Sequence, residues 1–167
     1  MNAPNTVTRK APSRRATFPY AIEIATRFMD NDVYGHVNNA VYYALFDTVI
    51  NRYLIAHGLD VLASPVIGLA AESGCRFHAS FAYPELIEAR LRVGHLGTSS
   101  VRYEVGLFAA NRDETSRDET GRDATSRDED PCRAEGHFVH VFVDRATRVP
   151  TPIPEPLRSA LAALLTR

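Results

Sequence analysis

Residues 30–54 read DNDVYGHVNNAVYYALFDTVINRYL and predict a polar turn that runs directly into a long amphipathic helix. Asp, Asn and Gly dominate residues 30–35, as is typical of turns. Asn38 and Asn39 are good N-caps and Gly58 is a good C-terminal stop, so we expect a helix from Asn38 or Asn39 to His57. Its apolar residues recur at the spacing of one wide stripe: Val41, Tyr42, Leu45, Phe46, Val49, Ile50, Tyr53 and Leu54. A stripe of this width indicates that other elements wrap much of the helix.

Strand-like segments lie on both sides of this helix in the sequence. Tyr20, Ile22 and Ile24 alternate with smaller or polar residues, which is the period of a strand. The segments that we predict as strands are 18–28, 66–81, 86–95, 99–110 and 133–145, with a tight connection at 97–98 and a short helix at 155–165. One long helix and an antiparallel run of strands predict an α+β domain in which a curved sheet wraps the helix.

The remaining segments define the domain boundaries. We expect residues 1–17 to form a disordered tail, because they are rich in Pro, Ser, Thr and basic residues and lack the apolar core of a signal peptide. Residues 18–167 then form one domain. Residues 112–131 read RDETS-RDETG-RDATS-RDEDP and contain almost no apolar residue, so we expect a charged loop insertion over residues 111–132. The alternative interpretation of this repeat is a handle that binds a partner.

The overall composition excludes several classes of protein. A net charge of −1 offers no field for gathering nucleic acid. No apolar run approaches the roughly 20 residues of a membrane span. Cys75 and Cys132 form no CxxC pair, so we expect two free thiols in a reducing compartment, and hence a cytoplasmic protein.

Most catalytic motifs are missing from the sequence. There is no Gly-x-Ser-x-Gly elbow, no HExxH, no paired CxxC and no glycine-rich nucleotide loop. His137 and His140 lie three residues apart on a predicted strand and therefore face opposite sides, so they cannot chelate one metal ion. Cys75 or Cys132 as a nucleophile would need a nearby histidine, and we interpret both as core or surface filler. We expect no metal and no cofactor.

Residues 30–39 are the remaining candidate site. Asp30 and Asp32 sit in the turn, and the helix that follows presents unpaired N–H groups with a partial positive charge. Those donors can hold an oxyanion, while a nearby carboxylate attacks a carbonyl group or activates water to attack it. Gly35 allows close approach of the backbone. The alternative interpretation is that both aspartates are turn and cap residues only.

The same stretch resembles a known family. Residues 18–156 resemble the 4-hydroxybenzoyl-CoA thioesterase group of hotdog proteins. The motifs that carry the resemblance are Arg27-x-x-Asp30-x-Asp32-x-x-Gly35-His36-Val37-Asn38-Asn39-Ala40-x-Tyr42, Phe46-Asp47, Cys75-Arg76-Phe77, Gly97-Thr98-Ser99-Ser100 and Phe138-Val139-His140-Val141-Phe142-Val143-Asp144. The first of these is specific, and the later ones are weak singly.

The resemblance implies an acyl-CoA thioester hydrolase with the hotdog fold and no metal or redox cofactor. It also implies a homodimer with a continuous sheet, often paired into a homotetramer. The catalytic carboxylate falls on Asp32, as general base or nucleophile, and the oxyanion donor on the backbone N–H at or near Asn39. Asp30 is then structural, and Asp47 anchors the helix or the dimer.

The resemblance also implies a set of binding residues. These are Gly35, His36, Asn38, Asn39 and Tyr42 for the substrate, with a weaker implication of CoA contacts at Gly97, Thr98 and Ser99. In the hotdog dimer the acyl pocket lies between subunits, so the resemblance implies that Tyr42, Phe46 and facing strand residues line it. His36 either hydrogen-bonds the substrate or closes the turn.

Two other functions fit a hotdog fold. One is a module that binds acyl-CoA, for instance in regulation, without turnover, because a fold does not determine function. The other is an acyl thioester hydratase or dehydratase. The Gly-Asp-x-Asn-Pro-x-His motif of that chemistry is absent, which disfavours it.

Overall fold

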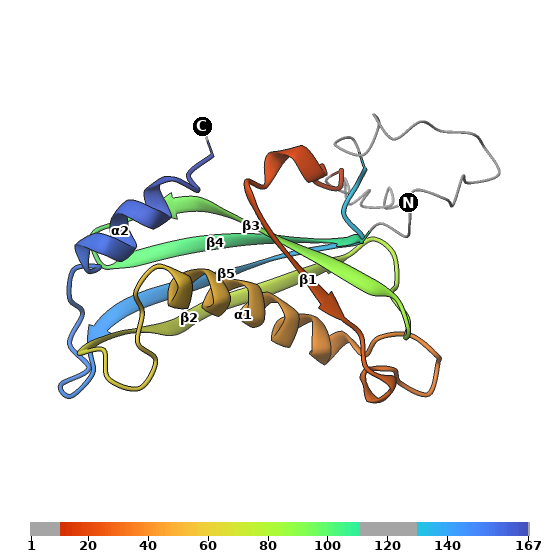
Figure 1. The fold of residues 1–167 in the computed structure, drawn as a ribbon, viewed down its shortest axis with the longest axis horizontal. Coiled ribbons are helices and arrows are strands. Elements are labelled where there is room, and N and C mark those ends of the chain that lie inside the picture. Colours follow the sequence, from red (N-terminus) through yellow and green to blue (C-terminus); the bar gives the residue numbers. More distant parts are fainter. Residues whose placement is uncertain (1–10, 111–129, 167) are drawn as a thin grey trace, which may run out of the picture.

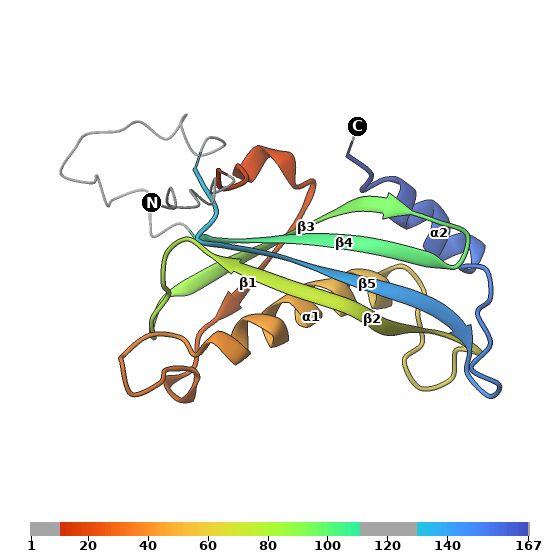
Figure 2. The same cartoon turned by 180° about the vertical axis from the view of Figure 1, so that it is seen from behind.

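The structure is a computed structural model that describes residues 11–110 and 130–166. Within these residues five strands form one antiparallel sheet: β1 (Tyr20–Ala25), β2 (Val66–Phe77), β3 (Leu86–Leu96), β4 (Ser100–Ala109) and β5 (Ala134–Asp144). The strand order is β1-β3-β4-β5-β2, so β1 and β2 form the edges. The long helix α1 (Asn39–Ala56) lies across one face of the sheet, and the short helix α2 (Glu155–Ala162) lies near the β3–β4 turn (Figures 1 and 2).

The helix α1 begins and ends where the capping residues predict. The Asn38 side chain accepts a hydrogen bond from the N–H of Ala40, and Gly58 beyond the last turn has a φ of +99°, which favours glycine. The predicted apolar stripe faces the sheet, with Val41 only partly buried. The buried side chains of α1 are Tyr42, Leu45, Phe46, Val49, Ile50, Tyr53 and Leu54. The α+β hotdog prediction is therefore confirmed.

The sheet presents an apolar face to α1 because its side chains alternate. Val101, Tyr103, Val105 and Leu107 of β4 are fully buried in the main core, as the period of two predicts. Gly136 of β5 lies under the ring of Phe46. A Cβ atom there would overlap that ring and would come within 2.6 Å of the Gly74 carbonyl oxygen. A glycine at this position thus sets the close approach of helix and sheet.

Some predicted strands are longer than the observed ones. Residues 78–81 leave the sheet because Phe77 pairs with Ala134, the first residue of β5, and no strand partner continues beyond it. The N–H groups of His78 and Ala79 both donate instead to the carbonyl oxygen of Arg133, at 2.7 and 2.9 Å. The predicted strand over 18–28 is limited to β1, because residues 28–30 form a 3₁₀ turn. The C-terminal helix likewise ends at Ala162.

Part of the predicted N-terminal tail packs on the domain. Residues 1–10 lie outside the described residues, as do residues 111–129 of the predicted charged loop. Arg15, however, is buried, pairs with Glu88 and donates to the Ala109 carbonyl oxygen. The tail prediction was therefore wrong for residues 13–17, because sequence composition does not reveal a buried partner for one arginine. Among the described residues, no helix is long and apolar enough to cross a membrane.

Candidate active site at the start of α1

The turn over residues 31–37 is closed by its own backbone. The N–H of Asp32 donates to the His36 carbonyl oxygen at 2.9 Å, and the N–H of Gly35 donates to the Asp32 carbonyl oxygen at 3.1 Å. Gly35 has a φ of +81°, in the left-handed region where glycine is favoured. Val37 is buried, and its N–H donates to the Phe81 carbonyl oxygen at 2.8 Å, which ties the turn to the domain.

Asp30 is held by Arg27. Its Oδ2 accepts from the Arg27 N–H at 2.7 Å, and its Oδ1 accepts from Arg27 Nε and Nη2 at 3.0 and 2.7 Å. The Asp30 carboxylate is buried, yet these hydrogen bonds, chiefly those from the Arg27 side chain, hold its pKa below the ordinary value. The Asp30 carbonyl oxygen also accepts from the N–H of Asn38 at 2.8 Å. Asp30 thereby fixes the chain where it enters α1.

Asp32 is placed differently. It is half-buried, and its Oδ1 accepts from the N–H of Tyr34 at 2.8 Å, which fixes the rotamer of the side chain. Among the described residues no donor contacts Oδ2. One carboxylate oxygen thus orients the group and leaves the other available to a substrate.

The N-terminus of α1 leaves one N–H group without an acceptor. The N–H of Ala40 donates to the Asn38 side chain at 2.9 Å, and the N–H of Val41 donates to the Asn38 carbonyl oxygen at 2.9 Å. Within the described residues the N–H of Asn39 has no such partner. A free N–H at the positive end of an 18-residue helix is suited to hold developing negative charge on an oxygen atom.

Asp32 and Asn39 line the same open cavity, of about 1190 Å³. Its wall includes Tyr42, whose buried hydroxyl oxygen accepts from the N–H of Phe81 at 3.3 Å and whose ring packs edge-on against Phe77 at 4.9 Å. Burial raises the pKa of Tyr42, so its phenol stays protonated. The full lining is Phe28, Asn31, Asp32, Val33, Tyr34, Gly35, Val37, Asn38, Asn39, Tyr42, Phe77, His78, Ala79 and Ser80.

Some of the predicted site residues lie elsewhere. The side chain of His36 is exposed, and His36 does not line the cavity. Phe46, which we expected in the acyl pocket, is fully buried in the core because Gly136 admits its ring against the sheet. Residues 97–99 form the β3–β4 turn, at the opposite end of the sheet from the Asp32 turn (Figure 1). The 11 residues of β3 separate the two turns by roughly 36 Å.

Sequence patterns did not indicate the far wall of the cavity. Phe77, His78 and Ser80 come from the end of β2 and the segment after it, 45 to 48 residues along the chain from Asp32. His78 and Ser80 belong to none of the quoted motifs, and the packing of this segment beside α1 brings all three residues to the site. The one available signal was the resemblance at Cys75-Arg76-Phe77, which indicated a strand and not a cavity wall.

The remaining cysteine and histidine candidates from the sequence lie in surroundings that indicate structural roles. Cys75 and Cys132 are free thiols, and burial raises the pKa of each to about 12, so neither is a ready nucleophile. His137 contacts Glu72 at 2.8 Å, whereas His140 is buried beside Tyr103 in the core. The two histidines thus face opposite sides of β5, as predicted.

Comparison with known proteins identifies the family. Residues 34–116 match the family model described as the Thioesterase superfamily. The PA5185 protein from Pseudomonas aeruginosa strain PAO1 is 45% identical, with 94% of this chain and 98% of that chain covered and a TM-score of 0.79. With its hotdog architecture and these matches, the chain belongs to the thioesterase superfamily. A comparison with curated protein sequences found no match.

Two more distant structures share the fold. The BH1999 gentisyl-coenzyme A thioesterase is 20% identical, with 85% of this chain and 99% of that chain covered and a TM-score of 0.66. Slr0204, a 1,4-dihydroxy-2-naphthoyl-CoA thioesterase from Synechocystis, is 14% identical, with 87% and 96% covered and a TM-score of 0.68. At these identities the likeness concerns the fold.

Proposed function

We propose that this protein hydrolyses acyl-CoA thioesters at the N-terminus of α1. The observation that carries the proposal is that Asp32 and Asn39 line one cavity, and that neither Asp32 Oδ2 nor the N–H of Asn39 has a protein partner among the described residues. A carboxylate beside an oxyanion donor is the equipment that acyl transfer requires. Family membership supports thioester hydrolysis as the reaction class.

Two routes fit this geometry. In both, the thioester carbonyl oxygen accepts a hydrogen bond from Asn39 N–H. In the first route, Asp32 takes a proton from water, the resulting hydroxide attacks the carbonyl carbon, and the C–S bond breaks to release CoA thiolate, which then gains a proton. In the second, Asp32 Oδ2 attacks the carbon itself, and the C–S bond breaks to give a mixed anhydride that water hydrolyses.

The cavity wall suits an apolar acyl group. Tyr42 and Phe77 form an edge-to-face pair in the lining, which also includes Phe28 and Tyr34. Two of the solved structures are described as thioesterases of gentisyl-coenzyme A and 1,4-dihydroxy-2-naphthoyl-CoA, both aromatic, so aromatic and aliphatic thioesters both belong in the assay. The β3–β4 turn at residues 97–99 could contact CoA at this cavity only from another copy of the chain.

We also propose that a second copy covers this face as a homodimer, with a homotetramer as the larger assembly. β2 is a 12-residue edge strand with many exposed residues, and an unprotected edge of this length readily pairs with another chain. Apolar side chains around the cavity are exposed, with Val33 at 94% and Tyr34 and Phe28 each at 82%. Exposed apolar side chains gathered at one place mark interaction surfaces. Sedimentation equilibrium should give a dimer or tetramer mass, and a monomer across the range used for assay would contradict this.

The proposed function is tested by thiol release from a panel of aliphatic and aromatic acyl-CoAs. Asp32→Asn and Asp32→Ala should lower kcat by about 10²–10⁴-fold, the contribution of a positioned general base. Asp60→Asn is the matched control, because Asp60 also caps a loop, accepting from the N–H groups of Leu62 and Ala63, yet lies outside the cavity. It should leave the rate unchanged.

Two results would contradict the proposal. Equal rates for wild type and both Asp32 variants would remove Asp32 from the mechanism. Acyl-CoA binding without thiol release from any thioester would identify a binding module instead. If hydrolysis is found, a single turnover in ¹⁸O-labelled water tests the second route, because label enters the Asp32 carboxylate only when that carboxylate is the nucleophile and water attacks the anhydride at the Asp32 carbon.

A further inference from the structure

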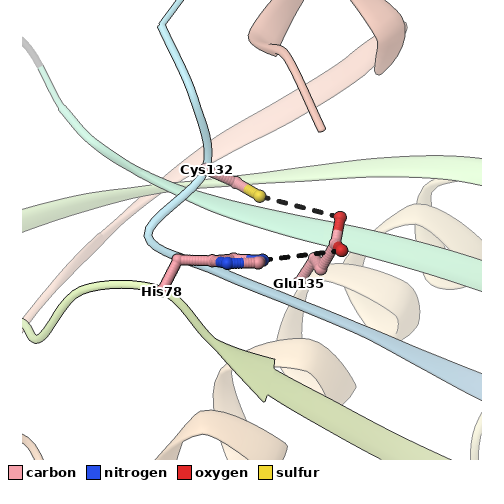
Figure 3. Close-up of side chains that lie close together, drawn as sticks. All are labelled: His78, Cys132 and Glu135. Atoms are coloured by element: carbon pink, nitrogen blue, oxygen red, sulfur yellow. Dashed lines mark hydrogen bonds and ion pairs between the residues drawn. The ribbon is translucent and has the colours of Figure 1, made fainter. Parts of the chain in front are cut away.

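A second cluster of reactive side chains lies where β2 ends and β5 begins. His78 follows β2, and Cys132 and Glu135 flank the start of β5 (Figure 3). Glu135 Oε2 lies 3.8 Å from Cys132 Sγ, and Glu135 Oε1 lies 3.5 Å from His78 Nε2. All three potential ligand atoms lie within 4.8 Å of one another.

His78 Nε2 lacks a satisfactory partner in this cluster. The atom is buried, and among the described residues it makes no hydrogen bond. Its 3.5 Å approach to Glu135 is an ion pair only if the imidazole is protonated. A buried nitrogen in this state calls for an explanation, and an ion at the centre of the cluster would supply one.

The backbone already holds the three residues together. The Arg133 carbonyl oxygen accepts from the N–H groups of both His78 and Ala79, so the segment after β2 is pinned beside the residues on either side of Arg133. The N–H of Cys132 donates to the Ser13 carbonyl oxygen at 2.9 Å. The cluster is therefore preorganised by main-chain contacts, and an ion would not have to gather its ligands from separate loops.

We propose that His78, Cys132 and Glu135 bind a divalent transition-metal ion of the zinc type. A thiolate, an imidazole and a carboxylate are the three side-chain ligands that Zn²⁺ uses in proteins. With metal–ligand bonds of about 2.0–2.3 Å, the ligand atoms of a tetrahedral site lie roughly 3.3–3.6 Å apart. The distances of 3.5 and 3.8 Å run to different oxygens of Glu135, and the three ligand atoms lie within 4.8 Å of one another, so side-chain shifts of about 1 Å would bring them to tetrahedral separations. Three protein ligands leave the fourth position to water.

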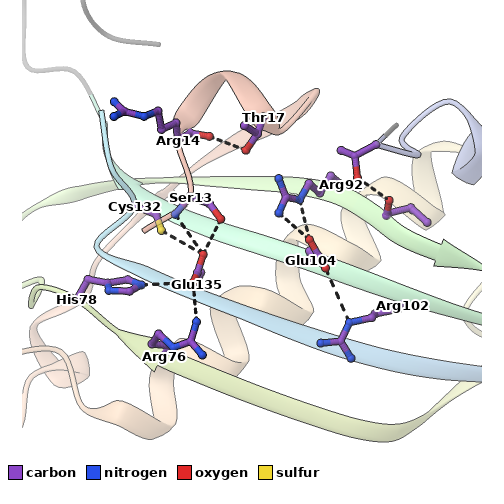
Figure 4. A network of polar contacts seen from close by, with 12 residues as sticks. Ser13, Arg14, Thr17, Arg76, His78, Arg92, Arg102, Glu104, Cys132 and Glu135 are labelled. Atoms are coloured by element: carbon purple, nitrogen blue, oxygen red, sulfur yellow. Dashed lines mark hydrogen bonds and ion pairs between the residues drawn. The ribbon is translucent and has the colours of Figure 1, made fainter. Parts of the chain in front are cut away.

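The surrounding charges and hydrogen bonds fit this role. On binding, the Cys132 S–H bond breaks, the sulfur binds the metal, and the proton passes to solvent. The resulting thiolate neutralises one charge of the ion, and the Glu135 carboxylate, which already pairs with Arg76, lies between the two cations. Ser13 Oγ donates to Glu135 Oε2 at 2.7 Å and Arg76 Nη1 donates to Oε1 at 3.1 Å, as Figure 4 shows. Such outer contacts orient a metal-binding carboxylate.

The metal would act on the cavity wall by holding it in place. Residues 78–80 line the Asp32 cavity, so an ion on His78 would fasten that wall to the start of β5. The inference is independent of the proposed catalytic roles of Asp32 and Asn39. Metal binding can therefore fail while hydrolysis stands, and the reverse also holds.

The test measures metal binding by the full chain after treatment with a chelator. Calorimetric titration with Zn²⁺ alone should give one ion per chain, and Co²⁺ should give a thiolate-to-metal charge-transfer band with the visible spectrum of a tetrahedral site. Cys132→Ser should abolish the charge-transfer band, and His78→Gln should abolish high-affinity binding. Ser13→Ala, which removes an outer contact, should weaken binding by about tenfold. Cys75→Ser and His137→Gln are the matched controls and should bind like wild type.

Circular dichroism of each variant checks that it is folded. If Cys132→Ser does not fold, the loss of binding in His78→Gln tests the proposal instead. Zn²⁺ uptake that is equal in wild type, Cys132→Ser and His78→Gln would overturn the proposal, because the ion would then sit on other groups. A Co²⁺ complex without a thiolate band would also overturn it, as would loss of that band in Cys75→Ser. In those cases Glu135 is only the hub of a hydrogen-bond network.

Discussion

Replacing Asn39 with proline removes the proposed oxyanion donor while leaving the helix intact. Proline has no N–H, and at the first position of a helix that N–H has no intrahelical acceptor to lose. The preceding residue must be extended, and Asn38 already has φ −58° and ψ 138°. Asn39→Pro should therefore leave the free energy of unfolding within about 0.5 kcal/mol of wild type, because proline is well tolerated at this position.

The expected kinetic effect follows from the number of donors at stake. The N–H groups of Ala40 and Val41 are engaged by Asn38, so Asn39 supplies the single free N–H at this end of α1 among the described residues. Loss of one oxyanion donor costs about 10²–10³-fold in kcat, or about 3–4 kcal/mol of transition-state stabilisation. The assay is thiol release at saturating acyl-CoA, with unfolding by urea measured in parallel.

The matched control is Asn39→Ala, which deletes the side chain but keeps the backbone N–H. It should retain activity near that of wild type. If Asn39→Pro and Asn39→Ala are equally active, the backbone N–H of Asn39 is not the oxyanion donor. If they are equally impaired, the side chain and not the N–H is what matters, and the reasoning is refuted as well.

Three further substitutions test the scaffold of the site, each by urea unfolding. Asp30→Asn should cost about 1–2 kcal/mol at neutral pH through weaker bonds to Arg27. Because the folded-state pKa of Asp30 is lowered, the difference in free energy of unfolding between wild type and Asp30→Asn should be present above the ordinary carboxyl pKa. It should vanish as the pH falls through the folded-state pKa, and a pH-independent difference would contradict this reasoning. Gly136→Ala should cost about 1–3 kcal/mol by forcing Phe46 from its place, and an unchanged midpoint would show that the helix can shift freely. Asn38→Ala should lower the free energy of unfolding by about 1 kcal/mol, because it removes the N-cap. A neutral effect would mean that the hydrogen bond from the Ala40 N–H to the Asn38 side chain is not formed in solution.

The local features of this protein follow from the sequence because short-range physics sets them. The bounds of α1 depend on Asn38 and Gly58, whose effects on the chain reach only a turn or so in either direction. The faces of β4 follow from the alternation of Val101, Tyr103 and Val105, since successive side chains of a strand must point to opposite sides. The proximity of Asp32 to the N-terminus of α1 is also local, because six residues join Asp32 to Asn39.

The arrangements that join distant segments were decided by the tertiary structure. The sequence places Arg15 in the tail, whereas in the structure it pairs with Glu88 in a buried position. The sequence likewise predicts Phe46 in the pocket, whereas its ring packs on Gly136 in the core. Phe77 and His78 reach the Asp32 cavity only because β2 ends where β5 begins. Each of these contacts depends on strand register and on how closely a helix approaches the sheet. Many residues set those two quantities together, and no single stretch of sequence displays them.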